Sequence, residues 1–149
     1  MRVYLDNCCF NRPFDDQTRI RVKLEAEAVL HIQGQILAGE IELAWSYVID
    51  YENQFNPFPE RRNSIQSWKH YAVLKVSETN DILKLAETIG AKGAETFDAL
   101  HVASAIEAAC SHFLTTDDLL LRKLSEFDKI KIVNPIQYLS ILERQNENR

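Results

Sequence analysis

Residues 95–118 read ETFDALHVASAIEAACSHFLTTDD and contain the most apolar helix pattern of the chain. Over residues 96–110 the apolar side chains recur on one helical face. Residues 113–115 then form a short β-prone run, and the pattern over residues 117–125 is again helical. This order of helix, strand and helix is typical of α/β folds in which the strands run parallel.

The same alternation continues over the rest of the chain. Strands are expected at residues 3–5, 41–44, 72–76, 113–115 and 130–133. Helices are expected at residues 16–39, 47–54, 63–71, 80–89, 96–110 and 117–125, and again after an Asn134 cap. In the first helix an apolar face is predicted from residues that recur at intervals of four, Ile20, Leu24, Ala28, Ile32 and Ile36. This spacing predicts a three-layer α/β/α fold with a central, mainly parallel sheet. The length of 149 residues fits a single domain over residues 1–149.

The composition is that of an ordinary globular protein, with 46% hydrophobic and 26% charged residues. No apolar run in the sequence reaches the roughly 18–20 residues that span a bilayer, and the N-terminal MRVYLDNCCF lacks the apolar segment of a signal peptide. We therefore expect a cytoplasmic protein with no membrane partner. Cys8, Cys9 and Cys110 lack the spacing of a zinc site and are expected to be small buried side chains.

The net charge of −5 argues against a general nucleic-acid binder, which usually carries a basic excess. This objection weakens if the acids are concentrated in a metal site, where cations neutralise them. Four acids occupy positions where a solvated charge would be unusual. These positions are the end of the first strand, a mixed apolar helix, the first turn of the most apolar helix and the end of the fourth strand, held by Asp6, Glu52, Asp98 and Asp117.

Each of these acids also has a purely structural explanation. Asp98 and Asp117 could cap or begin helices, Asp6 could lie in a turn, and Glu52 could be solvated. If instead the four converge, each close pair repels by about 4 kcal/mol at about 4 Å and an effective dielectric near 20. Such a cluster must take up protons or bind a cation. Ligands that offer only oxygen favour Mg²⁺ or Mn²⁺ over zinc.

Four segments carry a resemblance to a known family. They are VYLDN at residues 3–7, SYVIDYE at 46–52, ETFDALHVASAIEA at 95–108 and LTTDD at 114–118. In order and spacing they resemble the PIN domains, in particular the VapC-type toxins of toxin–antitoxin pairs. In that family the first strand ends in Asp, a Ser lies six residues before a helical Glu, an Asp opens a DALHxAxA helix, and a strand runs into T-x-D. The resemblance covers nearly the whole chain.

The resemblance implies a PIN-like fold and a ribonuclease that hydrolyses RNA phosphodiester bonds with Mg²⁺ or Mn²⁺. Asp6 and Asp98 would then bind the metal directly. Glu52 and Asp117 would complete the ligand set or hold metal-bound water.

Five further residues have roles that the sequence leaves open. Asp50 is an alternative to Glu52, and Asp118 is an alternative to Asp117, as an acid of the site. Asn7 stands where the family commonly carries Thr or Ser. Thr115 could orient the last acid or a phosphate oxygen, or could be an ordinary strand residue. His101 is expected to be a packing residue rather than a ligand.

Residues 56–62 read NPFPERR and are predicted to form a turn. Phe58 could stack on an RNA base, and Arg61 or Arg62 could hold phosphates. A solvated loop accounts for the same residues. An alternative set of phosphate-binding residues near the first acid is Arg12, Arg19 and Arg21.

Two other enzyme classes fail on their required residues. A haloacid-dehalogenase-type phosphatase needs a second Asp two residues after Asp6, where this chain has Cys8. A cysteine phosphatase needs Cys-x5-Arg, whereas Cys8 and Cys9 lead to Phe14 and Asp15. A structure-specific DNA nuclease usually carries larger helical insertions. The alternative that stays open is a non-catalytic PIN-like domain that binds RNA or protein.

The resemblance also implies two protein partners. One is a cognate antitoxin whose tail places a basic side chain in the acidic pocket, because Arg can bridge two carboxylates. The other is a second copy of the chain in a homodimer, for which the long first helix and the 63–71 segment, with Trp68 and Tyr71, offer surface.

Overall fold

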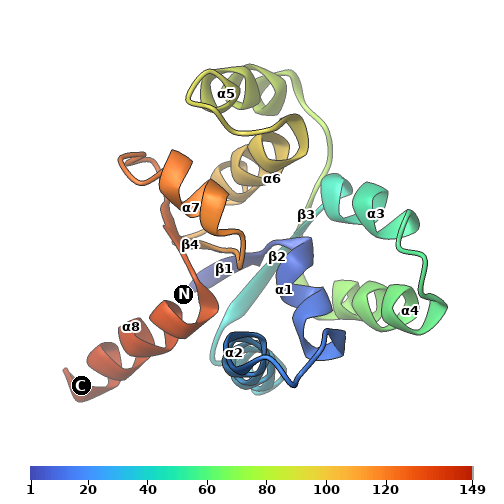
Figure 1. Ribbon diagram of the computed structural model, residues 1–149. Coiled ribbons are helices and arrows are strands. Elements are labelled where there is room, and N and C mark those ends of the chain that lie inside the picture. Colours follow the sequence, from blue (N-terminus) through green and yellow to red (C-terminus); the bar gives the residue numbers. More distant parts are fainter. Residues whose placement is uncertain (149) are drawn as a thin grey trace.

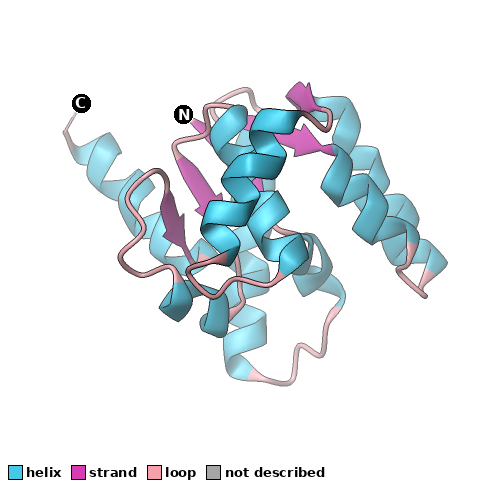
Figure 2. Ribbon diagram, turned by 90° about the horizontal axis from the view of Figure 1, so that it is seen from above, coloured by secondary structure: helices cyan, strands magenta, loops and turns pink. Residues whose placement is uncertain are grey.

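The computed structural model describes residues 1–148 as a parallel β-sheet enclosed by helices (Figure 1). Over this range the sheet has five strands in the order β3-β2-β1-β4-β5, and all four pairings between neighbours are parallel. Helices α5 and α6 lie on one side of the sheet and α2 and α8 on the other, and the view from above shows helices packed around the strands (Figures 1 and 2). The predicted three-layer α/β/α fold is therefore confirmed.

The bounds of the elements follow the predicted alternation closely. The strands are β1 (Arg2–Leu5), β2 (Glu42–Ser46), β3 (Ala72–Val76), β4 (His112–Leu114) and β5 (Lys131–Val133). The helices are α1 (Asn7–Asn11), η1 (Arg12–Phe14), α2 (Ile20–Leu37), α3 (Tyr47–Gln54), α4 (Pro59–Ser67), η2 (Trp68–Tyr71), α5 (Asn80–Gly90), α6 (Thr96–Glu107), α7 (Asp118–Lys123) and α8 (Pro135–Glu147).

The central strand β1 determines where the site forms. Its residues 3–5 are completely buried, and Leu5 pairs with Leu114 at the end of β4. The backbone N–H of Asp6 continues this pairing by donating to the carbonyl of Leu114 at 3.0 Å. Because parallel strands end at one edge, the loops after β1, β2 and β4 lie side by side there. Ligands of open α/β sheets bind beyond this carboxyl edge.

The first long helix differs from its prediction in start and in orientation. It begins at Ile20 rather than at residue 16, and Ile20 is 78% exposed. Leu24 is also exposed, so the predicted apolar face is only partly the buried one. The helix is rotated so that the fully buried Glu25 points inward.

Glu25 is tolerated in the interior because three polar groups satisfy its carboxylate. Arg12 contacts it through Nε at 2.9 Å and Nη2 at 2.8 Å, Arg21 lies 3.4 Å away, and the Asn134 amide donates to it. A buried charge needs such partners, since its desolvation is costly. Two members of the alternative phosphate-binding set, Arg12 and Arg21, are therefore held by acids of the protein itself.

Two further boundaries differ from the sequence prediction. The predicted turn over residues 56–62 ends early, because α4 already begins at Pro59, a residue favoured in the first turn of a helix. Helix α6 ends at Glu107 rather than at residue 110, and the chain then turns through Ala109, whose φ is 57°. Within residues 1–148, no helix is long and apolar enough to cross a membrane. Arg149, the last residue of the predicted single domain, lies outside the described residues.

Candidate metal centre

The four predicted acids come from four different elements at the carboxyl edge of the sheet. Asp6 follows β1 and caps α1, and Glu52 lies in α3. Asp98 lies in the first turn of α6, and Asp117 caps α7 directly after β4. Asp6 is buried, Glu52 and Asp98 are half-buried, and Asp117 is exposed.

Asp6 is fixed by hydrogen bonds to both carboxylate oxygens. Its Oδ1 accepts from the backbone N–H of Asn7 at 2.8 Å, and its Oδ2 accepts from the Thr115 hydroxyl at 2.9 Å. The Cys8 thiol, 3.4 Å away, also donates to Oδ2. Burial raises the pKa of Asp6, and the Glu52 carboxylate adds to this rise, whereas His101 and the hydrogen bonds oppose it. A cation beside Asp6 would therefore favour its ionised form.

Thr115 links the first acid to the last one. Its hydroxyl donates to Asp6 and accepts from the backbone N–H of Asp117 at 3.1 Å, while its side chain is completely buried. Of the two functional roles considered for Thr115, the contacts support positioning of an acid. The hydroxyl has no exposed surface with which to reach a phosphate oxygen.

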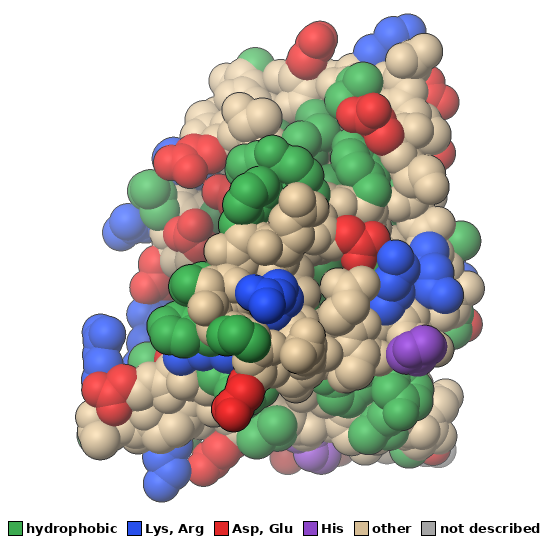
Figure 3. Space-filling model, turned by 90° about the vertical axis from the view of Figure 1, so that its right-hand side faces the viewer, with side chains coloured by type: hydrophobic (Ala, Val, Ile, Leu, Met, Phe, Trp, Pro, Cys, Tyr) green, Lys and Arg blue, Asp and Glu red, His purple; other side chains and the backbone are tan. Residues whose placement is uncertain are grey.

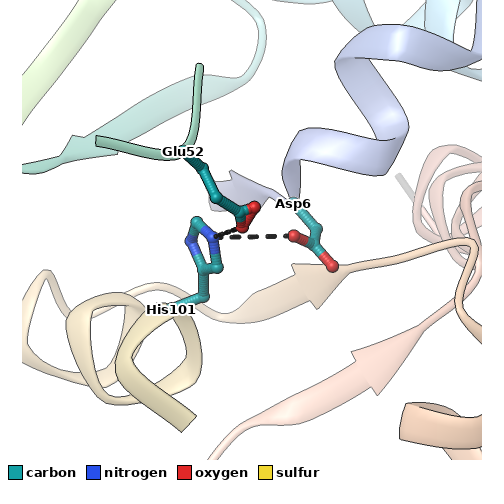
Figure 4. Close-up of side chains that lie close together, drawn as sticks. All are labelled: Asp6, Glu52 and His101. Atoms are coloured by element: carbon teal, nitrogen blue, oxygen red, sulfur yellow. Dashed lines mark hydrogen bonds and ion pairs between the residues drawn. The ribbon is translucent and has the colours of Figure 1, made fainter. Parts of the chain in front are cut away.

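Glu52 is held by a chain of hydrogen bonds that was not predicted from the sequence, and Figure 4 shows its first link, from His101 to Glu52. The Oε1 atom of Glu52 lies 2.7 Å from Nε2 of His101, and Nδ1 of His101 lies 2.6 Å from the Tyr4 hydroxyl. The Tyr4 hydroxyl in turn lies 2.6 Å from the Ser46 hydroxyl, which accepts from the first backbone N–H groups of α3. The chain therefore begins and ends on the helix that carries Glu52.

The donors in this chain have a consistent order. A carboxylate only accepts hydrogen bonds, so Nε2–H of His101 donates to Glu52. In the neutral ring, Tyr4 donates to Nδ1 and Ser46 donates to Tyr4. Burial lowers the pKa of His101, but the carboxylates of Glu52, Asp6 and Asp98 outweigh it and raise this pKa overall. In either charge state Nε2–H points at Glu52.

Asp98 lies where both burial and neighbouring charges raise its pKa. Burial raises its pKa to about 6, and the charges of Asp6, Asp117 and Glu52 add to this effect. Desolvation and like charge both disfavour the ionised form, and a perturbation of this size is typical of functional sites. Asp98 therefore lies close enough to the other three acids for their charges to affect its ionisation.

Asp117 does occupy the capping position that its structural explanation required. Its Oδ1 accepts from the backbone N–H groups of Leu119 at 3.0 Å and Leu120 at 3.2 Å. Capping engages Oδ1 only, so the second carboxylate oxygen of Asp117 is left for a metal or a metal-bound water.

The two alternative acids are engaged elsewhere. Asp50 accepts from Lys69 at 2.9 Å and from the indole N–H of Trp45 at 2.9 Å, and these contacts lower its pKa despite partial burial. Asp118 forms a bidentate pair with Arg21, which lowers its pKa. Each carboxylate is already neutralised by a cation of the protein.

The donor set fits a divalent cation. Ligand atoms of Asp6, Glu52 and His101 lie within 4.8 Å of one another, close enough to surround one ion. Because Nε2–H of His101 donates to Glu52, the two carboxylates are the members of this group that can bind the ion. Asp98 and Asp117 stand outside this group, although the charges of Asp6, Asp117 and Glu52 act on Asp98. Two acids with raised pKa values and few neighbouring cations form a negative site, and oxygen-rich sites of this kind suit hard cations such as Mg²⁺ and Mn²⁺.

The predicted substrate-binding residues fall into two groups. Asn7 lines the site, is 8% exposed, and its Oδ1 has no hydrogen-bond partner among the described residues. The arginines, in contrast, are already engaged: Arg61 donates to Asp15 at 2.9 Å and to the Phe14 carbonyl at 2.7 Å, and Arg62 donates to the Asn56 carbonyl at 2.9 Å. These contacts do not support a role for either arginine in phosphate binding.

Two residues differ from what the sequence predicted for them. His101 is buried as expected for a packing residue, but both of its ring nitrogens bond to polar groups of the site. Cys8 is half-buried rather than buried, and it contacts Asp6 and Thr115. Cys9 and Cys110 are buried as predicted, and all three thiols are free.

Solved structures share this fold. A chain of VapBC2 from Rickettsia felis, determined bound to a DNA fragment from their promoter, matches with a TM-score of 0.60 and 10% sequence identity over 90% of this chain and 98% of that chain. A chain of VapBC-1 from nontypeable Haemophilus influenzae matches with a TM-score of 0.56 and 14% identity over 91% and 98%. At these identities the likeness establishes the fold alone. No protein-family model and no curated protein matches the sequence.

Proposed function

We propose that this chain is a PIN-domain, metal-dependent endoribonuclease and the toxin of a type II toxin–antitoxin pair. The observation that carries the proposal is the convergence of Asp6, Glu52 and Asp98 at the carboxyl edge of the sheet, where Asp98 has a pKa of about 6. A fold shared with chains of two VapBC structures supports it.

In this proposal Asp6 and Asp98 bind Mg²⁺ or Mn²⁺, and Glu52 and Asp117 complete the ligand set or hold metal-bound water. The metal, when bound, polarises the phosphate and lowers the pKa of an attacking water. Thr115 and Cys8 hold the Asp6 carboxylate, and His101 holds Glu52 as a hydrogen-bond donor. Such supporting contacts orient the ligands of metal sites.

The test is cleavage of a fluorescent single-stranded RNA by the purified protein with Mn²⁺, with Mg²⁺ and with EDTA. We expect cleavage with the metals and none with EDTA. Asp6→Asn should reduce it by more than about 100-fold, because loss of a ligand exceeds the roughly 10–100-fold cost of losing a supporting contact. Asp50→Asn is the matched control, since Asp50 is already paired with Lys69, and it should cleave normally.

A non-catalytic PIN-like domain that binds RNA or protein is the alternative function. It predicts RNA binding without cleavage at any metal concentration, and equal behaviour of Asp6→Asn and the wild type. The acids argue against it, because a site that only binds a polyanion gains nothing from buried negative charge.

The proposal includes partners and a location that remain predictions. A cognate antitoxin should neutralise the acidic site with a basic side chain, and the chain should form homodimers in the cytoplasm. The surface of the predicted 63–71 segment supports self-association, since Tyr71 is exposed and its ring packs at a tilt against Trp68, with centroids 5.5 Å apart. Growth arrest on expression, relieved by co-expression of the small protein encoded beside it, tests the toxin role.

A further inference from the structure

A polar pocket of about 260 Å³ opens beside Glu52, between α1, α3 and α4. The chemistry proposed above uses only Glu52 at its wall. Its wall carries Asn7, Asn11, Asn53, Asn56, Phe55 and Phe58. Four asparagines and two phenylalanines in one small pocket are a distinctive combination, because amides offer both donors and acceptors whereas the rings offer flat apolar faces.

Both phenylalanine rings of the pocket are presented to solvent. Phe55 is 64% exposed and Phe58 is 54% exposed. Tyr51 supports the Phe55 ring edge-to-face, with centroids 5.1 Å apart, and the Arg61 guanidinium lies 4.7 Å from the Phe58 centroid. The face of the molecule that carries α3 and α4 shows hydrophobic side chains gathered around basic and polar ones (Figure 3). Aromatic rings held in place but left exposed are suited to stack on a flat ligand.

The half-buried amides of Asn11 and Asn56 keep hydrogen-bonding capacity for a ligand. The Asn56 amide donates to Asn11 Oδ1 at 3.1 Å and the Asn11 amide donates to the Asn7 carbonyl at 2.9 Å, which fixes both side chains. An amide nitrogen carries two hydrogens and each of these bonds uses one, so one N–H of each side chain is left to donate to a ligand. Asn7 Oδ1 and Asn53 Oδ1 lack a hydrogen-bond partner among the described residues, but both atoms are buried out of reach of a ligand.

The charge of the pocket excludes a phosphate as its occupant. Glu52 contributes a negative charge, and Arg61, the one cation among residues 1–148 that lines the pocket, is already paired with Asp15. The ligand should therefore be uncharged, flat and able to donate and accept hydrogen bonds. A nucleobase has these properties, since its face stacks on aromatic rings and its edge pairs with an asparagine amide.

We propose that this pocket binds one unpaired nucleobase of the RNA, next to the phosphodiester at the metal centre. The inference rests on the proposed ribonuclease function and adds to it a subsite that selects the position of cleavage. Ligand sites for larger molecules measure roughly 300–1,000 Å³. A pocket of about 260 Å³ therefore suits a single base.

The first experiment tests the pocket without cleavage. Each of the four ribonucleosides and, as a base-free control, ribose 5-phosphate is titrated calorimetrically into the protein in EDTA. At least one nucleoside should bind, and ribose 5-phosphate should not. Phe55→Ala should weaken nucleoside binding by about 5- to 100-fold, the range for loss of one stacking ring, and Phe55→Trp should retain it. The control Tyr71→Ala removes an exposed aromatic residue outside the pocket, 51% exposed against 64% for Phe55, and should leave nucleoside affinity unchanged.

The second experiment links the pocket to cleavage. A set of short RNAs, each lacking the base at one successive position, is cleaved with Mn²⁺ by the wild type and by Phe55→Ala. One missing base should raise the KM of the wild type, and Phe55→Ala should lose this position dependence. Failure of all RNAs to be cleaved would overturn the ribonuclease function, whereas the nucleoside titration would still decide the pocket. Nucleoside binding that Phe55→Ala leaves unchanged, or no binding at all, would overturn the pocket itself.

Discussion

Replacing Asp98 with Asn should stabilise the metal-free protein at neutral pH, because it removes one charge from a crowded acidic site. The pKa of Asp98 is raised from 3.8 to about 6, a difference of about 2 units. At about 1.36 kcal/mol per unit, ionisation of Asp98 costs the folded state at most about 3 kcal/mol. Because the side chain is only half-buried, solvent reduces this figure to about 1–3 kcal/mol.

The substitution also removes a favourable charge from the start of a helix, and this loss of stability is smaller than the gain. Asp98 lies in the first turn of α6, where a negative charge stabilises a helix by about 0.3–1 kcal/mol. The net expectation for Asp98→Asn is a gain of about 1–2 kcal/mol, which raises the Tm of a chain of this size by about 2–8 °C. The purely structural explanation of Asp98 predicts the opposite sign.

The pH dependence of the free energy of unfolding gives a second check on the sign of the predicted stability change. A carboxyl group whose pKa is raised on folding contributes stability at pH values below its unfolded pKa, and this contribution is lost as the pH rises through about 6. The gain from Asp98→Asn should therefore be full at pH 7.5 and vanish near pH 4.

The assay is thermal unfolding in EDTA at both pH values, with Asp81→Asn as the matched control. Asp81 occupies the first turn of α5 but is exposed, so this variant should lose a few tenths of a kcal/mol. With Mn²⁺, Asp98→Asn should lose both the stabilisation by metal and RNA cleavage. A variant that melts lower than the wild type in EDTA at pH 7.5, and cleaves RNA normally with Mn²⁺, would refute the reasoning.

Three further perturbations follow from the contacts. Tyr4→Phe removes the hydroxyl between Ser46 and His101, so the free energy of unfolding measured in urea should fall by about 1–3 kcal/mol and the cleavage rate by about 10–100-fold. Unchanged activity would show that this chain of hydrogen bonds does not support the site. Glu25→Gln leaves Arg12 and Arg21 without their buried acid and should destabilise the fold by about 3 kcal/mol while the folded fraction cleaves RNA normally, and a loss of cleavage in fully folded protein would contradict this. Light scattering at tens of micromolar should give the mass of a dimer, and Tyr71→Asp should shift it toward the monomer; a monomeric wild type would count against self-association.

Much of the fold could be predicted because local patterns and tertiary packing agree. The buried run at residues 3–5 is apolar enough to indicate a central strand, and Asn134 followed by Pro135 is a strong helix start, confirmed by a capping box in α8. The prediction was wrong where residues distant in the sequence determine which face of a helix is buried. The sequence alone favours an apolar stripe through Ile20 and Leu24, but Glu25 points inward because Arg12 and Asn134 meet it from elsewhere in the chain.

The candidate site, too, could be predicted only where the local sequence pattern determines it. Asp6 and Asp117 could be placed at one edge because parallel strands end together, whereas Glu52 and Asp98, which lie in helices, were added to the site by the family resemblance. His101 could not be assigned from its sequence position, since its partners Tyr4 and Glu52 lie 97 and 49 residues away. The roles proposed for Arg61 and Arg62 depended on free guanidinium groups, and their contacts with Asp15 and Asn56 became visible only in three dimensions.

The central claim is that the carboxylate edge binds a metal in order to cut RNA. Mn²⁺ binding and RNA cleavage measured on the same samples, over one range of Mn²⁺ concentrations, test it most directly. We expect cleavage to rise in step with metal occupancy in the wild type, and both to be lost together in Asp6→Asn. Mn²⁺ that binds without cleavage at saturation, or cleavage that persists in EDTA or in Asp6→Asn, would contradict the claim.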